Sequence, residues 1–407
     1  MSDDFRRFFL ALALGKTGAE ISSLAIPLVA VLTLDATPGQ VGLLAALHTV
    51  AFLLIGLPAG AWLDRVRRRG VLVAADVARA ALLATVPVAW ALDLLTLPQL
   101  YAVVLLSSVA RVFFDIAAAS YLPHLVDRGQ LVTANARLAT VDSAGQVAGP
   151  AAGGWLVQVL GPPLAVALDA VSYLWSAGWL LSIRRPEPAP APRVARRLGA
   201  EIREGLSFVR AHPVLRAVVI AGGLTNVALA ASFTMIPVVL VRELGHAEAV
   251  LGAYLAVASV GGLLGAATAR PLARWLGDAR AVWLLGIGVA PVAVLVPLVG
   301  HVPIALAAAG WAVVSYKVAV DNVLLISFRQ QVTPDPLLGR VNATVRVLLT
   351  GCVTAGAAAA GLLGQLAGPR AALWLSACVL AVIWVPVFRS PLRDTRDLTN
   401  IRTSVRT

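Results

Sequence analysis

The hydrophobic positions of this chain are gathered into long runs that short polar turns separate. A helix that crosses a lipid bilayer needs about 20 mostly apolar residues, and runs of that length recur from one end of the sequence to the other. The pattern predicts twelve membrane-spanning helices, at residues 8–34, 40–63, 71–93, 98–122, 136–160, 163–183, 215–241, 249–270, 280–299, 303–328, 342–366 and 371–388.

Arginine and lysine outside these runs fall almost entirely on one side of the predicted membrane. If the N-terminus is cytoplasmic, the loops on the opposite side hold only Arg242 and Arg370. Cytoplasmic loops of membrane proteins are enriched in these cations. We therefore expect a bacterial inner-membrane protein with both termini in the cytoplasm. The net charge of +12 then reflects topology and not nucleic acid binding.

Composition narrows the class of protein further. The chain is 59% hydrophobic and 13% charged, whereas soluble globular proteins carry about 25% charged residues. These values exclude a disordered chain and an ordinary soluble enzyme. Cys352 and Cys378 stand inside apolar runs and predict neither a disulfide framework nor a zinc site. The sequence has no Gly-x-x-x-x-Gly-Lys-Ser/Thr loop for ATP, and we expect no cofactor and no metal.

The longest hydrophilic stretch lies at the middle of the chain. It opens with a proline-rich linker, and further on Leu198, Ile202, Leu206 and Val209 share one helical face. That face predicts a basic amphipathic helix on the inner leaflet. The expected domains are six-helix bundles at 1–183 and 214–388, a cytoplasmic linker at 184–213 and a basic cytoplasmic tail at 389–407.

The two halves of the sequence repeat one another. Asn135-Ala136 and Asn342-Ala343 stand 207 residues apart, and the same spacing pairs Gly161-Pro162 with Gly368-Pro369. Parallel repeats of six spans are typical of duplicated transporters. The sequence thus predicts an all-α integral membrane fold with twelve transmembrane helices in two pseudo-symmetric six-helix bundles.

The turn between the second and third spans reads Gly60-Ala61-Trp62-Leu63-Asp64-Arg65-Val66-Arg67-Arg68-Arg69. It resembles the signature loop of the major facilitator superfamily, Gly-x-x-x-Asp-Arg-x-Gly-Arg-Arg, with Arg67 in place of the second glycine. Gly60 would let two helices approach closely, and Asp64 could accept from an arginine or a helix N-terminus. We expect Gly60, Asp64, Arg65, Arg68 and Arg69 to latch the inward face shut; a purely basic anchor is the alternative.

In the fifth span, glycines and a proline form the pattern Gly-x-x-x-Gly-Pro-x-x-Gly-Gly. Small residues four positions apart make a flat face for tight helix packing, and the proline bends the helix there. The pattern resembles the antiporter motif of superfamily exporters, with Val141 where that motif has one more glycine. The resemblance implies export, and a generic packing contact is the alternative. The motif residues are Gly145, Gly149, Pro150, Gly153 and Gly154.

Two further stretches, 119–137 and 204–213, are similar to segments of bacterial macrolide-efflux and enterobactin-exporter-like permeases. With them the resemblance covers residues 5–390. It implies the fold of the superfamily and transport by alternating access, in which one bundle rocks against the other.

Charged side chains inside the predicted spans are the candidate functional residues, because an ionisable group at mid-bilayer costs about 3 kcal/mol on insertion scales. Lys16 and Glu20 lie one turn apart in the first span. Glu20 is a candidate proton carrier that takes a proton from one side and releases it to the other. A static ion pair between Lys16 and Glu20 is the alternative.

Two repeat-related pairs also stand four residues apart, Arg111 with Asp115 and Lys317 with Asp321. They are expected either as pairs near the cavity whose protonation changes with state or as structural ion pairs. Arg111 matches the arginine of the superfamily's fourth-span motif, and Asn226 is a candidate cavity-lining residue.

For the other ionisable side chains inside the predicted spans, a structural role is the first expectation. Asp76 and Arg79 are expected to pair structurally near the inner end of the third span, and His48 to be a hydrogen-bonded packing residue. Asp142 is placed to hydrogen-bond across helices, and Asp169 falls near the outer end of the sixth span.

Together the patterns and the resemblance predict a secondary active transporter, acting as a monomer in the lipid bilayer. The resemblance implies export of small amphipathic molecules, such as drugs, macrolides or siderophores, and we expect protons as the coupling ion. A proton moving inward gains about 2.3 kcal/mol per 100 mV. Two alternatives stay open: an uptake permease for a small metabolite, and a membrane sensor or structural protein without turnover.

Overall fold

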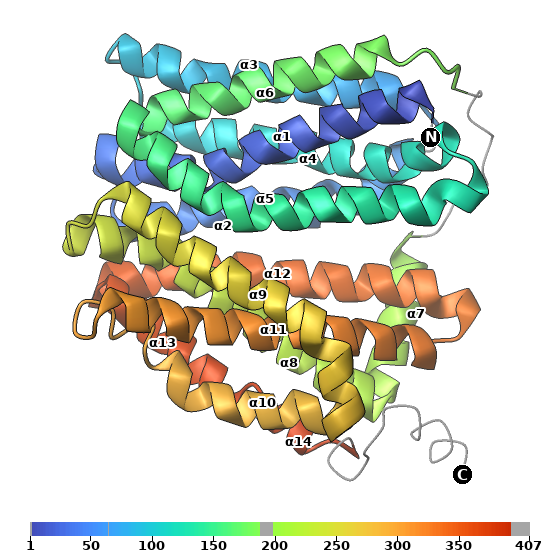
Figure 1. Cartoon of the computed structure of the whole chain (residues 1–407), viewed down its shortest axis with the longest axis vertical. Coiled ribbons are helices and arrows are strands. Elements are labelled where there is room, and N and C mark those ends of the chain that lie inside the picture. Colours follow the sequence, from blue (N-terminus) through green and yellow to red (C-terminus); the bar gives the residue numbers. More distant parts are fainter. Residues whose placement is uncertain (1, 64, 188–197, 392–407) are drawn as a thin grey trace. The chain divides into compact units, whose positions relative to one another are not determined.

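The computed structural model describes residues 2–63, 65–187 and 198–391. Asp64 of the predicted latch, most of the proline-rich linker and nearly all of the basic tail lie outside these ranges. The described residues are helical almost throughout (Figure 1), and the β pairing among them is one isolated bridge, Val299 with Val302. The helices are α1 (Asp3–Leu28), η1 (Val29–Thr33), α2 (Pro38–Leu63), α3 (Arg68–Ala91), α4 (Leu97–Leu125), η2 (Arg128–Gln130), α5 (Leu131–Leu160), α6 (Pro162–Ser182), α7 (Leu198–Ala211), α8 (Pro213–Pro237), η3 (Val238–Glu243), α9 (Glu248–Leu276), α10 (Asp278–Ala293), α11 (Ile304–Val332), α12 (Asp335–Ala367), α13 (Pro369–Val382) and α14 (Val385–Phe388).

Ten helical segments within the described ranges are long and apolar enough to cross a membrane. Two predicted spans have no such segment, and they correspond to α5 and α10. Helix α5 carries Asn, Thr, Asp, Ser and Gln side chains along its length, and α10 has 16 residues. At 1.5 Å per residue, α10 reaches about 24 Å, less than the roughly 30 Å of hydrocarbon. The chain is a multi-pass membrane protein, and the count of twelve spans stays a prediction.

Local sequence signals set several helix boundaries. The Ser2 hydroxyl accepts from the Phe5 amide at 3.3 Å and caps α1. Gly161 and Gly368 end α5 and α12 with φ of 82° and 89°, a left-handed conformation that glycine adopts at little cost. Each glycine is followed by the proline that opens the next helix, because proline suits the first helical turn. The Gly-Pro pair of the sequence repeat is therefore the same helix-to-helix turn in both halves.

The chain divides into two compact units. The first unit contains residues 1–195 and 241–256, and the second contains 196–240 and 257–407. The sequence placed 241–256 in the C-terminal bundle. The segment groups with the first unit because the beginning of α9 packs closely on α5, where Gly252 lies against Gly154.

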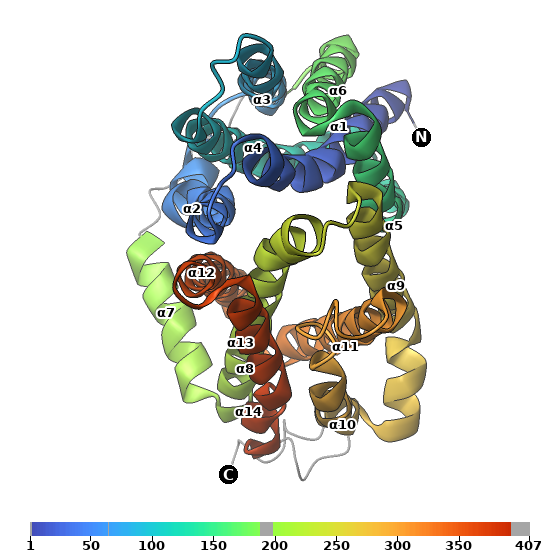
Figure 2. The ribbon, with the colours of Figure 1, turned by 90° about the vertical axis from the view of Figure 1, so that its left-hand side faces the viewer.

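Each unit repeats the same set of helix contacts (Figure 2). In the first unit α1 packs on α5 and α6, and α3 packs on α4 and α6. In the second unit α8 packs on α12 and α13, and α10 packs on α11 and α13. Proline near the end of α1 and of α8 is followed in both cases by a π-helical turn, η1 and η3. The repeat read from the sequence is thus matched by a repeat of packing.

Each unit has its own apolar core. In the first unit the core gathers where α1, α4 and α6 meet, and the rings of Phe8 and Tyr121 pack edge to face with centroids 5.8 Å apart. In the second unit Leu215, Leu324 and Phe328 are buried together. These cores fix the helices that carry the charged side chains.

Helix α7 packs on α12 within the second unit. Val209, on the predicted apolar face, is 4% exposed and packs with Val341 and Val345. Gly205 lies so close to α12 that a Cβ there would stand 2.8 Å from the Arg340 carbonyl oxygen. Part of the apolar face of α7 is therefore covered by protein, and its position on the inner leaflet stays a prediction.

Candidate functional site

The glycine motif of α5 forms the contact with α1. A Cβ at Gly149 would stand 2.5 Å from the Glu20 Cβ and 3.0 Å from its Cγ, and one at Gly145 would meet the same side chain at 3.8 Å. A Cβ at Gly153 would lie 3.4 Å from the Ile21 Cα. Helix α1 can lie this close because the facing positions of α5 carry no side chain. The predicted packing face and the predicted proton carrier thus share one contact.

The other glycine of the motif faces α9. A Cβ at Gly154 would lie 2.6 Å from the Glu248 carbonyl oxygen and 2.8 Å from the Gly252 Cα. A Cβ at Gly252 would in turn meet the carbonyl oxygen of Pro150. Glycine therefore stands on both sides of this backbone contact, and α5 is held closely on two faces.

Lys16 pairs across helices with Asp142, which projects from α5. The sequence offered Glu20, one turn along the same helix, as its partner. The Lys16 and Asp142 side chains are 41% and 37% exposed, so solvent weakens their attraction. Glu20 is half-buried and keeps Lys16, Asp142 and Arg111 as its charged neighbours.

Arg111 links this group to α2 and to its own helix α4. Its guanidinium lies 3.2 Å from His48 Nε2 and its Nε 3.6 Å from the Asp115 carboxylate. The Arg111 and Asp115 side chains are each about half exposed. We call Lys16, Glu20, Arg111, Asp115 and Asp142 the charge cluster. With every group ionised it holds three negative and two positive charges, so one added proton makes it neutral.

The repeat-related pair of the second unit has different surroundings. Lys317 and Asp321 form a hydrogen-bonded ion pair within α11, and their side chains are 3% and 13% exposed. Asn226 donates to the Gly222 carbonyl oxygen of its own helix, α8, at 2.8 Å. The Lys317–Asp321 pair is thus buried, whereas its counterpart in the first unit, Arg111–Asp115, is half exposed.

The basic residues of the predicted latch bind within the first unit. Glu187, just after α6, accepts from the backbone amides of Arg68 at 2.9 Å and Arg69 at 3.2 Å. These amides are at the start of α3, where a carboxylate is favourable. Arg69 also donates to the carbonyl oxygens of Leu180 and Leu181. The sequence gave no sign of Glu187, because the residues it joins are more than a hundred positions apart.

Two latch residues have few neighbours. Among the described residues, no atom lies within 4 Å of where a Gly60 Cβ would stand, so the close helix approach expected there is not found. Arg65 is exposed, and its backbone amide donates to the Trp62 carbonyl oxygen.

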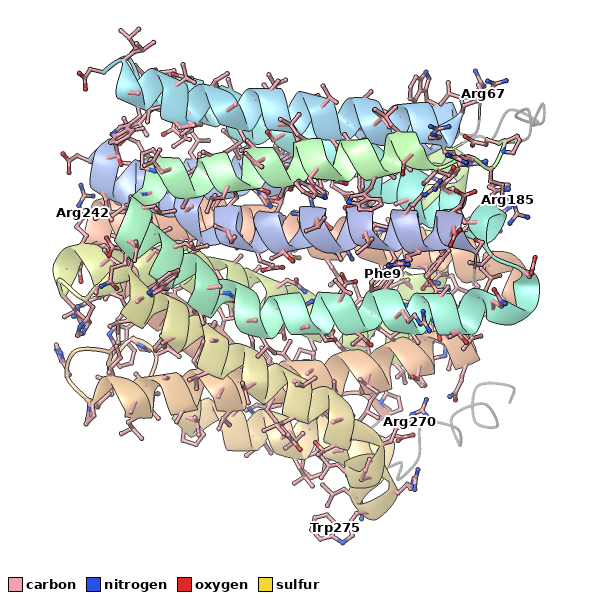
Figure 3. All side chains as sticks on the ribbon, turned by 45° about the horizontal axis from the view of Figure 1, so that its top comes forward. Phe9, Arg67, Arg185, Arg242, Arg270 and Trp275 are labelled. Atoms are coloured by element: carbon pink, nitrogen blue, oxygen red, sulfur yellow. The ribbon has the colours of Figure 1, made fainter. Side chains whose placement is uncertain are left out.

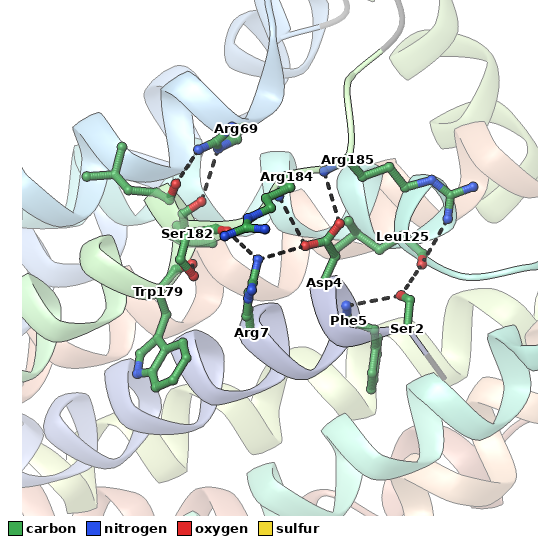
Figure 4. A network of polar contacts seen from close by, with 12 residues as sticks. Ser2, Asp4, Phe5, Arg7, Arg69, Leu125, Trp179, Ser182, Arg184 and Arg185 are labelled. Carbon is green, nitrogen blue, oxygen red and sulfur yellow. Dashed lines mark hydrogen bonds and ion pairs between the residues drawn. The ribbon is translucent and has the colours of Figure 1, made fainter.

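The same end of the first unit carries a wider polar network (Figure 4). Asp4 accepts from the backbone amides of Arg184 at 3.0 Å and Arg185 at 2.9 Å. Arg7 donates to the Ser182 carbonyl oxygen, and Arg185 to that of Leu125. In Figure 3, Arg67 and Arg185 lie at this end of the unit and Arg242 at the other. The basic side chains therefore tie helix ends together.

Four charged residues that the sequence analysis left outside the functional candidates lie in groups of charged side chains. Asp142 belongs to the charge cluster, and Asp169 is buried at 1% exposure together with Asp76 and Arg79. A sequence search for pairs four residues apart sees only one helix at a time and misses such groups. The described residues contain no group of three or more His, Cys, Asp or Glu that could hold a metal ion.

Comparisons with known proteins find similarity to membrane transporters. Residues 8–343 match the family model of the Major Facilitator Superfamily. The chain is 29% identical over 401 residues to the multidrug efflux pump Tap of Mycolicibacterium fortuitum, with 95% of each chain covered. It is 27% identical over 391 residues to the enterobactin exporter EntS of Shigella boydii, with 94% of this chain and 90% of that protein covered.

Solved structures share the fold. A bacterial homologue of the iron transporter ferroportin, in its inward-facing state, superposes with a TM-score of 0.76 at 16% identity over 96% of this chain and 99% of that one. The nucleoside transporter NupG superposes with a TM-score of 0.71 at 12% identity over 95% of this chain and 100% of that one.

Proposed function

The chain belongs to the Major Facilitator Superfamily, and we propose that it exports small amphipathic molecules from a bacterial cell in exchange for protons. It is a membrane transporter with a small-molecule substrate, and not an enzyme. The direction, the coupling ion and the mechanism of alternating access belong to the proposal.

One observation carries the proposal: the Glu20 carboxylate stands at the close contact between α1 and the glycine face of α5. A side chain so placed links its own charge to the packing of two helices. When Glu20 is ionised, it is attracted by Lys16 and Arg111 and repelled by Asp142. When it binds a proton, those forces on it weaken. The repulsion between Glu20 on α1 and Asp142 on α5 is then relieved, while the Lys16–Asp142 pair still joins the two helices.

This arrangement gives a route to coupling. One proton neutralises the charge cluster, and a neutral cluster costs less to enclose away from water than a charged one. The unit can then change conformation with the proton bound and release it on the other side. A proton entering the cell supplies about 2.3 kcal/mol per 100 mV, which can drive an outward movement of substrate.

The relatives and the composition support the proposed substrate class. One relative is named a multidrug efflux pump and another an enterobactin exporter. The chain is only 13% charged, which suits amphipathic cargo better than a sugar or a phosphate ester. Drugs, macrolides and siderophores are therefore the classes to test.

Susceptibility of a strain that overproduces the protein tests the function. A panel of macrolides, other amphipathic drugs and siderophores is measured with and without a protonophore. We expect higher tolerance to some compounds, and loss of that tolerance with the protonophore. Higher susceptibility with accumulation in the cell would indicate uptake instead. No change across the panel, together with no flux in proteoliposomes, would favour the sensor.

A further inference from the structure

A second group of charged side chains lies inside the first unit, between α1, α3 and α6, and has no member in common with the charge cluster. We call Asp76, Arg79, Asp169 and Tyr173 the buried cluster. Their exposed fractions are 1% for Asp76, 9% for Arg79, 1% for Asp169 and 1% for Tyr173. Burying a charge is costly unless it is paired and hydrogen-bonded, so the partners of each group matter.

Arg79 is held mainly by α6. Its guanidinium donates to the Tyr173 hydroxyl and lies over the tyrosine ring, with Cζ 3.7 Å from the ring centroid. A cation over an aromatic face is stabilised by the ring. Asp76 is the more distant partner, since its carboxylate lies 3.9 Å from the Arg79 guanidinium.

The two carboxylates differ in their hydrogen bonds. The Ser172 hydroxyl donates to the Asp169 backbone carbonyl oxygen at 2.8 Å and shares this proton with the Asp169 carboxylate at 3.2 Å. Within the part of the chain that the structure describes, neither oxygen of Asp76 accepts a hydrogen bond of ordinary geometry, although the Ser176 hydroxyl faces it. The charged and polar groups around the pair are Arg79, Asp169 and Ser176 for Asp76, and Arg79, Arg111, Ser22 and Ser172 for Asp169.

The charges of the buried cluster do not balance. Asp76 pairs with Arg79, and Asp169 faces the same guanidinium and, in addition, Arg111. Arg111 is half exposed and lies beside Asp115, so Arg79 is the one buried cation for these two buried carboxylates among the described residues. A net charge in such surroundings is costly because it has lost its hydration, and one bound proton removes that charge. Asp76 lacks the donors that favour an ionised carboxylate, whereas Asp169 has one. The geometry therefore assigns the proton to Asp76.

The second unit indicates that these charges are not needed for packing. Asp169 and Ser376 each stand seven residues after the proline that opens their helix, α6 and α13. Ser22 and Ser232 each stand five residues before the proline of α1 and α8. In the second unit Ser376 bonds to Ser232 at 2.7 Å and to the Ala228 carbonyl oxygen at 2.8 Å. The same helix contact is thus made there by neutral serines.

We propose that Asp76, Arg79 and Asp169 form a buried proton-binding site in the first unit, which holds one proton on Asp76. Its part in transport deepens the proposed function and rests on it, because this proton would be a coupling proton in addition to that of Glu20. Its occupancy is a separate property that can be measured in protein that transports nothing.

Infrared spectroscopy of the purified full-length protein in detergent tests the occupancy at neutral pH. A protonated carboxylic acid has its own carbonyl stretch, distinct from that of a carboxylate. We expect Asp76→Asn to remove one such signal. Asp169→Asn should also remove it, because Asp76 then remains as the sole carboxylate beside Arg79 and ionises. The matched control is Asp93→Asn, an exposed aspartate just after the same helix α3, which should change nothing.

Thermal unfolding separates this site from a plain ion pair. Asparagine resembles a protonated aspartate, so Asp76→Asn should leave the unfolding midpoint nearly unchanged; an ionised Asp76 would make the same variant unstable. Spectra of Asp76→Asn and Asp169→Asn that keep every acid signal of the wild type would overturn the proposal, whatever the transport assays give. If Asp76→Asn does not fold, the proposal is overturned on that ground. Loss of the signal in a protein without proton-driven flux would keep the site and reject the proposed function.

Discussion

At the scale of single residues, the helix contact between Glu20 and Gly149 joins a charge to a packing surface. The sequence could identify both residues, one as an acid within a span and the other as part of a glycine pattern. It could not place them against each other, because that contact depends on how α1 and α5 pack.

Replacement of Glu20 by glutamine tests its role in coupling. The variant keeps the shape of the side chain but removes the exchangeable proton, so efflux that depends on the proton gradient should be lost while binding of substrate is retained. Efflux from loaded proteoliposomes under an imposed pH gradient measures the effect. Glu243→Gln, at an exposed acid of η3, is the control and should transport normally. Proton-driven efflux by Glu20→Gln at the normal rate would remove Glu20 from the mechanism.

Replacement of Gly149 by valine tests the packing surface. A Cβ at this position would stand 2.5 Å from the Glu20 Cβ, so the larger side chain must push α1 and α5 apart. Overpacking of this kind costs about 1–3 kcal/mol, and we expect a lower unfolding midpoint together with loss of flux. Gly178→Val in α6, where no described atom lies within 4 Å of the added Cβ, is the matched control. Equal behaviour of the two variants would mean that the close contact has no functional weight.

At the scale of helices, residues distant in the sequence fix where an element begins. Glu187 caps α3, and the Asp4 carboxylate holds the chain that leaves α6. Such contacts have no sequence signal, because a cap is recognisable only when it lies next to the helix that it caps. Turns with local signals were predictable, as at Gly161-Pro162, where glycine and proline are neighbours.

Loss of the Glu187 carboxylate should destabilise the start of α3. Glu187→Ala leaves the amides of Arg68 and Arg69 without their acceptor, and a lost helix cap costs about 1 kcal/mol. Thermal unfolding in detergent measures this loss. Glu187→Gln keeps one acceptor oxygen and should lose less, and Asp127→Ala, at an exposed acid, should lose nothing. If Glu187→Ala unfolds at the wild-type temperature, the cap makes no net contribution.

The cap of α8 should be sensitive to acid. His212 Nδ1 accepts from the Leu215 amide at 3.3 Å, and burial lowers the pKa of His212 below its usual value of 6.5. As the pH falls, His212 is therefore protonated in the unfolded chain before it is protonated in the folded protein. The stabilisation is present above about pH 6.5 and is lost as the pH falls through the folded-state pKa.

Thermal unfolding of His212→Asn measures that sensitivity. Asparagine can cap a helix at any pH, so between about pH 7 and about pH 5 the unfolding midpoint should fall less in this variant than in the wild type. The exposed His301→Asn should keep the wild-type pH dependence. A fall of the same size in all three proteins would exclude His212 as its cause.

At the scale of the whole molecule, the sequence repeat predicted that the helices of the two halves would make the same contacts. The shared contacts of α1 and α8, and the paired π-helical turns, agree with it. The repeat did not predict how far the paired charges differ in burial. Lys317 and Asp321 are buried, whereas Arg111 and Asp115 are half exposed. Burial depends on the neighbouring helices, and equal spacing along one helix does not determine it.

The orientation of the chain in the membrane is testable as a whole. Arginine is concentrated at the ends that the sequence places in the cytoplasm, and cytoplasmic loops favour such residues. Reporter fusions after residue 187 should therefore report a cytoplasmic position, and fusions after Gly245 the opposite side. The reverse assignment would contradict the predicted topology and, with it, the direction of transport.

The polar network that ends at Glu187 also defines where the polypeptide can be divided. A chain severed after this residue keeps in one fragment the Glu187 carboxylate and the two amides at the start of α3 that it binds. One severed before it forfeits that carboxylate from the first fragment. Two genes that encode the halves separately should therefore complement each other better when the upstream product extends through Glu187.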